Sequence, residues 1–357
     1  MQNNRNRANG LARQPSQWRG GVLACCSLAT VATLAALAGD WPQFRGPNGD
    51  GTCAERIRTN WQAQPPRLLW RKTSADNLQG GFSSFAVSGG RVFTQVRRAV
   101  SGQDREVCVA LNAETGAELW ASPVGRVAYD GGAASPDGPR STPTVQGDRV
   151  FVLSSWLVLS CLNATNGAVV WSKDLMALYG STMISWQNAA SPVVENGLVI
   201  VNANVPNKSL LALRAADGSL AWQTSASDKM TQATPVPVTL LGARQVIFYA
   251  QSGLVAVNPT NGAVLWRYAC TYNGTSIAAS PVVAGDLVYC SAAYNTGARA
   301  VRVSRTGGAF RTNQVWRLSG ALQNHWTTPV YCQGYLYGLY GYGNTSDAPL
   351  ECVDPAT

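Results

Sequence analysis

Few side chains in this chain of 357 residues combine the types and the spacing that catalysis or metal binding requires. The single histidine, His325, argues against a Ser-His-Asp triad and against a histidine-rich metal or haem site. No C-x-x-C pair and no C-x-x-C-H haem motif occurs. The stretch NGDG at 48–51 has the composition of a calcium loop, but Gly46 and Ile57 occupy the first and twelfth positions, where such loops carry carboxylates. We therefore expect a glycine-rich turn there, and neither a catalytic residue nor a metal site.

Polar and aromatic residues gather in four longer stretches between apolar runs, at 121–141, 172–190, 225–233 and 318–328. Loops on a rigid scaffold often carry binding sites. The candidate ligand-binding residues in these stretches are Asp130, Asp137, Arg140, Asn188, Gln232, His325 and Trp326. Aromatic rings, amides and an Arg-Asp pair suit an anionic or sugar-like ligand. The alternative interpretation is that these side chains hydrogen-bond the loops to one another.

A repeated phrase identifies the elements that must position these loops. CVALNAETGAELW (108–120) returns as SCLNATNGAVVW (160–171), LALRAADGSLAW (211–222) and VAVNPTNGAVLW (255–266). Each copy is a short apolar run, a turn with glycine, and a run that ends on tryptophan. This pattern is typical of a hairpin, because glycine accepts the positive φ that a tight turn needs. Each unit opens with Ser/Thr-Pro and a second glycine turn, so four antiparallel strands form one unit.

Regularly spaced tryptophans give the period of the repeat. Six of them follow at spacings of 50, 51, 51, 44 and 50 residues: Trp70, Trp120, Trp171, Trp222, Trp266 and Trp316. Repeated units of this length predict an all-β fold, a β-propeller of four-stranded antiparallel blades with six blade motifs visible. We expect each tryptophan to cover the apolar face between neighbouring blades.

Two forms of the ring are compatible with these motifs. In a closed ring of six blades, the strand that contains Trp70 completes the last blade and removes the exposed sheet edges. In a ring of seven or eight blades, this chain supplies six. The composition suits either form, since only 13% of residues are charged while 35 are glycine and 12 are tryptophan. The formal charge of +9 is spread thinly, with no basic run longer than Arg97-Arg98, so nucleic-acid binding is not predicted.

The N-terminus is typical of an export signal at 1–38. Four arginines and no acidic residue precede the apolar stretch 21–38, which ends on the small-x-small site Ala-Leu-Ala at 36–38. We expect export to the periplasm or cell surface, with cleaved, lipidated and membrane-anchored forms all open, and membrane contact through this segment alone. A Gly/Pro-rich leader that packs on the propeller is expected at 39–69, and the propeller itself at 70–357.

Seven of the nine cysteines lie outside the signal segment, and an odd number argues against a full disulfide framework. Aligning the repeats places Cys161 and Cys352 where another repeat has Ala110. The same alignment places Cys108 and Cys290 where others have leucine or valine. Cysteine is frequently a buried apolar residue, so we expect these thiols to fill inward strand positions.

These units resemble the PQQ-like repeat, the blade motif of the quinoprotein alcohol dehydrogenase-like superfamily. The resemblance rests on the SPVV openings, the G-D-x-V-Y turns and the L-x-A-L-x-A-x-x-G-x-x-x-W phrases over about residues 80–357. The segment DWPQFRGPNGDGT at 40–52 is similar to the leader of many exported bacterial members. The superfamily contains calcium- and pyrroloquinoline quinone (PQQ)-dependent alcohol dehydrogenases, and also non-catalytic BamB-type envelope propellers.

For the dehydrogenases, the resemblance implies a Glu/Asn/Asp calcium set, an Asp base and a disulfide between adjacent cysteines over the cofactor. The only adjacent cysteines here, Cys25-Cys26, lie in the signal segment, and the calcium set has no residue-by-residue match. We therefore predict an exported, non-catalytic binding or assembly scaffold of the bacterial cell envelope, without a cofactor. Its expected partners are envelope proteins or a small polar ligand. The alternative function is a PQQ- and calcium-dependent oxidoreductase.

Overall fold

The computed structural model describes residues 39–78, 80–128, 137–270, 277–341 and 348–357. By its contacts the chain divides into Met1–Ala36 and Leu37–Thr357, and the description below concerns the second unit. Helix is sparse there, with α1 (Leu175–Tyr179) and a single 3-10 turn at Ser74–Asp76. None of the helices in the described part has the length and apolar character that a membrane span needs.

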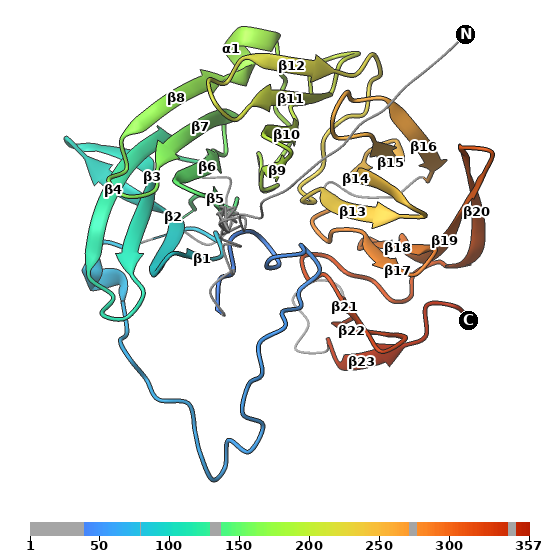
Figure 1. Ribbon diagram of the computed structural model, residues 1–357, viewed down its shortest axis with the longest axis horizontal. Coiled ribbons are helices and arrows are strands. Elements are labelled where there is room, and N and C mark those ends of the chain that lie inside the picture. The colour runs from blue at the N-terminus through green and yellow to red at the C-terminus, as the bar shows by residue number, and fades with distance from the viewer. Residues whose placement is uncertain (1–38, 79, 129–136, 271–276, 342–347) are drawn as a thin grey trace, which may run out of the picture. The chain divides into compact units, whose positions relative to one another are not determined.

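Six antiparallel sheets make up the unit, five of four strands and one of three within the described residues (Figure 1). The first sheet contains β1 (Ala86–Ser88), β2 (Arg91–Val100), β3 (Gln103–Asn112) and β4 (Glu118–Arg126). The second contains β5 (Thr144–Gln146), β6 (Arg149–Leu153), β7 (Val158–Asn163) and β8 (Val169–Asp174). The third contains β9 (Val193–Glu195), β10 (Leu198–Asn202), β11 (Leu210–Arg214) and β12 (Leu220–Gln223).

The remaining three sheets follow in chain order. The fourth contains β13 (Val236–Leu240), β14 (Ala243–Ala250), β15 (Gly253–Val257) and β16 (Val264–Ala269). The fifth contains β17 (Val282–Ala284), β18 (Leu287–Ala292), β19 (Gly297–Thr306) and β20 (Ala309–Leu318). The sixth contains β21 (Val330–Cys332), β22 (Tyr335–Leu339) and β23 (Leu350–Val353). In every sheet the spatial order equals the chain order, which confirms the predicted all-β propeller of antiparallel blades.

The core lies between successive sheets rather than inside any one of them. Between the second and third sheets, Phe151, Leu159 and Trp171 share one buried cluster with Val199 and Leu211. Comparable clusters join the first sheet to the second, the third to the fourth, the fourth to the fifth and the fifth to the sixth. Each fully buried leucine or phenylalanine contributes about 1.5–3 kcal/mol, so stacking of neighbours carries much of the stability.

The repeated tryptophan and glycine meet across the boundary between repeats. Trp171, at the outer edge of the second sheet, donates its Nε1–H to Ala215 O of the third at 2.9 Å. A Cβ added to Gly218, in the hairpin turn of the third sheet, would lie 2.8 Å from the Trp171 ring. Trp120 makes the same pair of contacts with Ala164 O and Gly167. The turn glycine is therefore required twice, for its positive φ and for the space that the preceding repeat's indole fills.

Trp70 makes these contacts from a segment that is not a strand. Its Nε1 donates to Ala113 O at 2.9 Å, and a Cβ on Gly116 would lie 2.7 Å from its ring. Residues 66–72 have no strand partner within the described residues, and β23 has none on its outer side. The expected pairing of this segment with the last blade is therefore not present. Trp70 instead packs on the first sheet, where the hairpin of β3 and β4 offers the same indole-sized recess as the other repeats.

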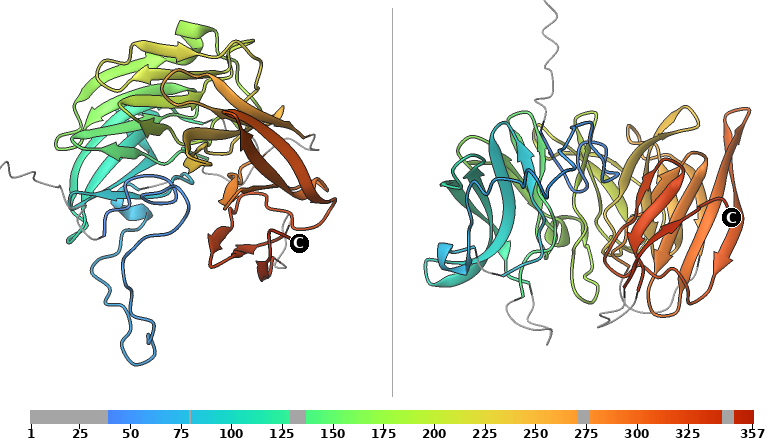
Figure 2. Two further views of the ribbon diagram at one scale, coloured as in Figure 1. Left: turned by 45° about the vertical axis from the view of Figure 1, so that its right-hand side comes forward. Right: turned by 90° about the horizontal axis from the view of Figure 1, so that it is seen from below.

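The leader contacts the inner strands through residues 40–52, at one end of the sheets (Figure 2, right). Trp41 pairs with Val87 of β1 through two backbone hydrogen bonds of 2.7 and 2.8 Å. Arg45 donates to the carbonyl oxygens of Thr328 and Pro329, at 2.8 and 2.7 Å, at the start of the sixth sheet. Residues 53–69, in contrast, are exposed throughout.

Candidate functional site

The loops that carry the six described candidate residues gather at the end of the sheets opposite the β1–β2 turn, and we call this end the mouth. Successive hairpins of an antiparallel sheet turn at opposite ends. Asp40 of the leader accepts from Ser88 Oγ at 3.0 Å, at the β1–β2 turn, whereas Ser154 and Ser155 form the β6–β7 turn. The loops after β4 and β8 lie at this second end and contact that turn.

The hydrogen bonds of the site begin at a buried carboxyl group on β3. Glu106 accepts the backbone N–H of Ser155 on Oε2 at 2.9 Å, and Ser155 O accepts the backbone N–H of Asn188 at 3.2 Å. The Asn188 amide in turn donates to Ser154 O and Ala190 O at 3.4 and 3.1 Å. These contacts connect the first sheet, the second sheet and the loop before the third, so Asn188 holds the loops together as the alternative interpretation expected.

Asp137 and Arg140 form the predicted pair, with Arg140 Nη2 2.5 Å from Asp137 Oδ1. Both side chains are largely shielded from solvent. The Arg140 guanidinium also lies 5.7 Å from the centre of the Phe82 ring and close enough to Glu106 to interact with its charge. We call Glu106, Asp137, Arg140, Ser155 and Asn188 the Glu106 cluster. Because Asp137 already offsets its charge, Arg140 is a weaker anchor for an anion than the sequence suggested.

Several buried polar atoms of this region have no partner among the described residues. They are Gln95 Oε1, Glu106 Oε1, Asp137 Oδ2, Arg140 Nη1, Ser141 Oγ and Ser155 Oγ. Burial raises the pKa of Glu106, and the hydrogen bonds from Ser155, the N–H of Ala128 and the charge of Arg140 only partly oppose this. A protonated Glu106 can donate a hydrogen bond as well as accept one. Unpaired buried groups of this kind bind ordered water or a small polar molecule.

His325 and Trp326 form an aromatic group at the start of the sixth repeat. Their rings stack at 4.2 Å with an interplanar angle of 19°, and the Tyr294 ring meets His325 edge-on at 5.1 Å. Burial lowers the pKa of His325, which favours the neutral imidazole at neutral pH. Trp326 itself is 66% exposed, and a second tryptophan, Trp186, is 37% exposed in the loop after α1.

The loop that carries Trp186 is conformationally strained. Trp186 and Gln187 both have positive φ, 66° and 58°, a region that residues with a Cβ rarely adopt. Gln232 fixes this loop from the next repeat, since its Nε2 donates to Ser185 O at 2.9 Å. Strained backbone that neighbours hold in place is typical of functional loops.

The seven predicted residues therefore have different roles. Asp137, Arg140 and Asn188 belong to one cluster, Gln232 holds a loop, and His325 with Trp326 forms the aromatic group. Asp130 lies outside the described residues. Sequence reasoning missed Glu106 because it ends the polar stretch QDRE (103–106), in which an acidic residue is expected to be exposed. The available signal was its spacing, since it lies two and four residues before Cys108 and Ala110 on the same face of the strand.

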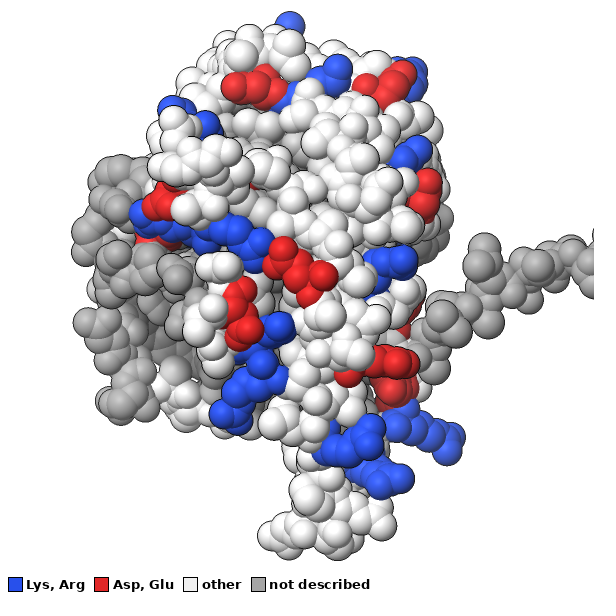
Figure 3. Space-filling view, turned by 90° about the vertical axis from the view of Figure 1, so that its left-hand side faces the viewer, with Lys and Arg blue, Asp and Glu red and all other residues white. Residues whose placement is uncertain are grey.

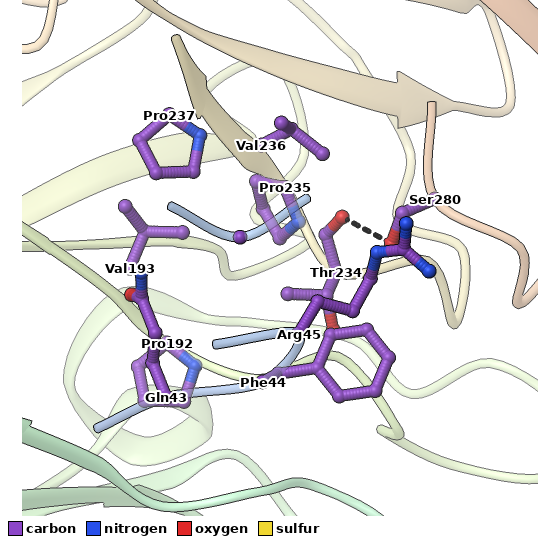
Figure 4. A pocket seen from close by; sticks show the side chains of 11 residues that line it. Gln43, Phe44, Arg45, Pro192, Val193, Thr234, Pro235, Val236, Pro237 and Ser280 are labelled. Carbon is purple, nitrogen blue, oxygen red and sulfur yellow. Dashed lines mark hydrogen bonds between the residues drawn. The ribbon is translucent and has the colours of Figure 1, made fainter. Parts of the chain in front are cut away.

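The inner strands leave two cavities beside the leader. One of about 10 Å³ lies where Phe44 and Arg45 face Thr234 and Ser280, and it has room for about one water (Figure 4). The other, of about 430 Å³, is bordered by the leader and by the Arg244–Glu195 ion pair.

Charged residues of both signs are interspersed on the face over the first sheets (Figure 3). Arg97 pairs with Asp104 and Arg98 with Glu118, at 2.6 and 2.8 Å. These two adjacent arginines are thus both matched by carboxylates.

Repeated four-stranded sheets, tryptophan contacts between repeats and loops gathered at one end define the class of protein as a PQQ-like repeat β-propeller. The family profile described as "Outer membrane protein assembly factor BamB" matches residues 62–155 and 103–338. The chain belongs to this family, which confirms the resemblance stated from the repeats.

Two relatives carry that same description. The chain is 27% identical over 245 residues to the outer membrane protein assembly factor BamB of Moranella endobia, an alignment that covers 64% of this chain and 58% of the relative. It is 25% identical over 301 residues to that of Yersinia pestis, covering 80% of this chain and 68% of the relative. The chain thus spans less than two thirds of the first relative's length.

Solved structures share the fold. A europium-containing methanol dehydrogenase superposes with a TM-score of 0.51 at 12% identity, over 77% of this chain and 67% of its own. A quinohemoprotein alcohol dehydrogenase from Comamonas testosteroni superposes with a TM-score of 0.53 at 14% identity. This alignment covers 87% of this chain and 48% of the dehydrogenase. At such identity the likeness concerns the propeller alone.

The side chains of the Glu106 cluster are a poor match for the calcium set that the resemblance to quinoprotein dehydrogenases implies. Within the described part of the chain, no three His, Cys, Asp or Glu side chains are grouped so that they could hold a metal ion. The carboxyls of Glu106 and Asp137 both interact with the positive charge of Arg140, which opposes the binding of a cation.

Proposed function

We propose that this chain is an exported, non-catalytic propeller that acts as a binding and assembly scaffold in the bacterial cell envelope, without a bound cofactor. Family membership over most of the chain supports the assembly role. The partners would then be envelope proteins that take part in building the outer membrane, as the name of the relatives states for those proteins.

The observation that carries this proposal is the contrast within the mouth. Arg140 pairs with Asp137 of its own loop, and Asn188 and Gln232 donate hydrogen bonds to neighbouring loops. The tryptophan rings of residues 186 and 326, in contrast, stay accessible. Exposed tryptophans on loops that a rigid scaffold holds are typical contact residues of protein interfaces. A catalytic site would instead need polar groups that converge on a reacting atom.

Site-specific photo-crosslinking tests the scaffold function. The photoreactive amino acid p-benzoylphenylalanine is incorporated at Trp326 or at Trp186 of the full chain, expressed in a Gram-negative bacterium. We expect both positions to crosslink an envelope protein of the outer-membrane assembly pathway. Leu220, on outer strand β12 and 40% exposed, is the matched control and should give no such adduct. Adducts at Leu220 alone, or at none of the three positions, would contradict the mouth as the docking surface.

A titration tests the cofactor part of the proposal. Purified, folded full chain receives PQQ with and without calcium, and tryptophan fluorescence is followed. A flat response is expected. Saturable quenching that needs calcium and weakens in Arg140→Ala would overturn the cofactor-free function and support the oxidoreductase alternative.

A further inference from the structure

Two cysteines meet in the core between the fourth and fifth sheets. Figure 1 shows these two sheets as β13–β16 and β17–β20. Cys270 directly follows β16, and Cys290 lies on β18. Both belong to the same buried cluster, and their thiols are hydrogen-bonded to each other. The space for the Cys270 sulfur comes from Gly253, where a Cβ would lie 3.1 Å from it.

Polar groups surround this pair in an otherwise apolar core. Arg299, the register partner of Cys290 on β19, is only 3% exposed and hydrogen-bonds Cys270. The hydroxyl of Tyr249 interacts with Cys290, and the backbone N–H of Leu254 donates to the sulfur of Cys270. A guanidinium held beside two thiols stabilises negative charge on sulfur.

Lone thiols elsewhere in the chain behave differently. Burial raises the pKa of Cys161 to about 11 and raises that of Cys108 further. For Cys270, the hydrogen bond from Cys290 outweighs burial, and the charge of Arg299 adds to it, so the pKa falls to about 7. Hydrogen bonding to Cys270 correspondingly raises the pKa of Cys290. The arrangement thus has one nucleophilic sulfur and one protonated partner, as reactive dithiols do.

We propose that Cys270 and Cys290 are a redox-active thiol pair, which a low-molecular-weight disulfide converts into a covalent bridge between the fourth and fifth sheets. The Cys270 thiolate attacks one sulfur of the small disulfide, whose S–S bond breaks and releases one thiolate. Cys290 then loses its proton and attacks the Cys270 sulfur of the mixed disulfide, which releases the second thiolate. The two protons of the cysteines pass to the released thiolates, so two protein thiols are oxidised while one disulfide is reduced to two thiols.

Redox titration with peptide mapping tests the proposal on the full chain. The folded protein is equilibrated at pH 7.5 with mixtures of reduced and oxidised glutathione, quenched with acid, alkylated and digested without reduction. We expect a peptide that joins residues 270 and 290 to accumulate. The melting temperature should rise by several degrees in parallel, because the bridge closes a loop of about 20 residues in the unfolded chain. If the exposed cysteines, Cys53, Cys332 and Cys352, become glutathionylated while no such peptide forms, the proposal is wrong.

Variants separate a reactive pair from two buried thiols. In Cys290→Ala the attack of Cys270 on the small disulfide remains possible, so Cys270 should accumulate as a stable mixed disulfide. The control Cys161→Ala, which removes a lone buried thiol, should leave formation of the 270–290 bridge unchanged. In Arg299→Met the midpoint of the pH dependence of Cys270 alkylation should rise by more than one pH unit from about 7. An unchanged midpoint in a folded variant would show that Arg299 acts only by packing, and would remove the activated thiolate from the proposal.

Discussion

The junction of the second and third sheets and the free face of the sixth sheet are built from similar residues but differ in burial. At the junction, Phe151, Leu159 and Leu211 are fully buried between two sheets. In the sixth sheet, Tyr337 is 40% and Leu350 74% exposed, because no sheet covers that face within the described residues. The apolar pattern of a strand is thus the same in both regions, and the neighbouring sheet decides whether that pattern contributes to stability.

The difference also leaves apolar side chains of the sixth sheet in contact with solvent. Exposed apolar side chains that lie together are typical of interaction surfaces. Exposed apolar side chains also occur in the segment 53–69, namely Ile57, Trp61, Leu68 and Leu69. The inner junctions, in contrast, have no apolar surface left to offer.

Replacing one aromatic in each region gives the largest contrast. We expect Phe151→Ala to lower the free energy of unfolding by about 3–5 kcal/mol, since it removes a fully buried ring and leaves a cavity. Tyr337→Ala in the sixth sheet should cost less than about 1 kcal/mol, because its ring is already partly solvated. Denaturant unfolding of both variants measures the difference. Equal losses would mean that the sixth sheet is covered in solution.

Two turn glycines test the same comparison, with a smaller expected loss of stability. Gly218→Ala combines a positive φ with overlap against the Trp171 ring, and should cost about 2–4 kcal/mol. Gly334→Ala, in the β21–β22 turn of the sixth sheet, has positive φ but open space around the added methyl, and should cost about 1 kcal/mol. Thermal melts of the pair separate backbone strain from indole overlap. If Gly218→Ala is as stable as Gly334→Ala, glycine at position 218 is not needed both for its positive φ and for the space that the indole fills.

A polar contact between the third and fourth repeats should give a smaller loss of stability than the aromatic and glycine substitutions. The buried carboxylate of Asp228 accepts from Arg267 at 2.5 and 2.8 Å and from Ser252 at 2.7 Å. Burial alone would raise the pKa of Asp228, but the hydrogen bonds from Arg267 and Ser252 and the arginine charge together lower it. We expect Asp228→Asn to cost about 2 kcal/mol at neutral pH, less than a fully buried pair because Arg267 is partly exposed.

The pH dependence checks the sign of this contribution. Because the pKa of Asp228 is lower in the folded than in the unfolded state, its stabilisation is complete above the unfolded pKa of about 3.9. It is lost as the pH falls through the lower folded value. Unfolding curves of the parent and of Asp228→Asn should therefore converge in acid. Glu351→Gln, in the sixth sheet, is the control and should change stability by about 0.5 kcal/mol or less at any pH. Parallel curves for parent and Asp228→Asn would exclude the carboxylate as the stabilising group.

The repeat in the sequence was sufficient to predict the sheets, because glycine turns, apolar alternation and tryptophan spacing are local or strictly periodic signals. It also pointed correctly to the Asp137–Arg140 pair, three residues apart in one loop. The sequence could not predict the hydrogen-bond partners of Trp70 and Glu106. These partners, Ala113 and Ser155, lie 43 and 49 residues away along the chain.

The cysteines show the same limit. Aligning the repeats gave Cys108, Cys161 and Cys290 inward positions, and the structure confirms that all three are buried. The same expectation was wrong for Cys352, which is exposed on β23 because no further sheet covers that strand within the described residues. It could not pair Cys290 with Cys270, because that contact crosses from one repeat to the next. Residue types predict what one strand does, whereas the chemistry of this molecule arises between strands of different repeats.

The contact between each indole and the following repeat's glycine has a consequence for how such a molecule can be cut and recombined. The two halves of the contact lie about 45 residues apart in the chain, as in Trp120 and Ala164, so the interlocking unit begins on the outer strand of one sheet and ends in the hairpin of the next. A graft that exchanges whole sheets therefore splits an indole from its recess at both ends. Swapping segments that run from just before one tryptophan to just before the next instead keeps every ring and its recess in the same parent.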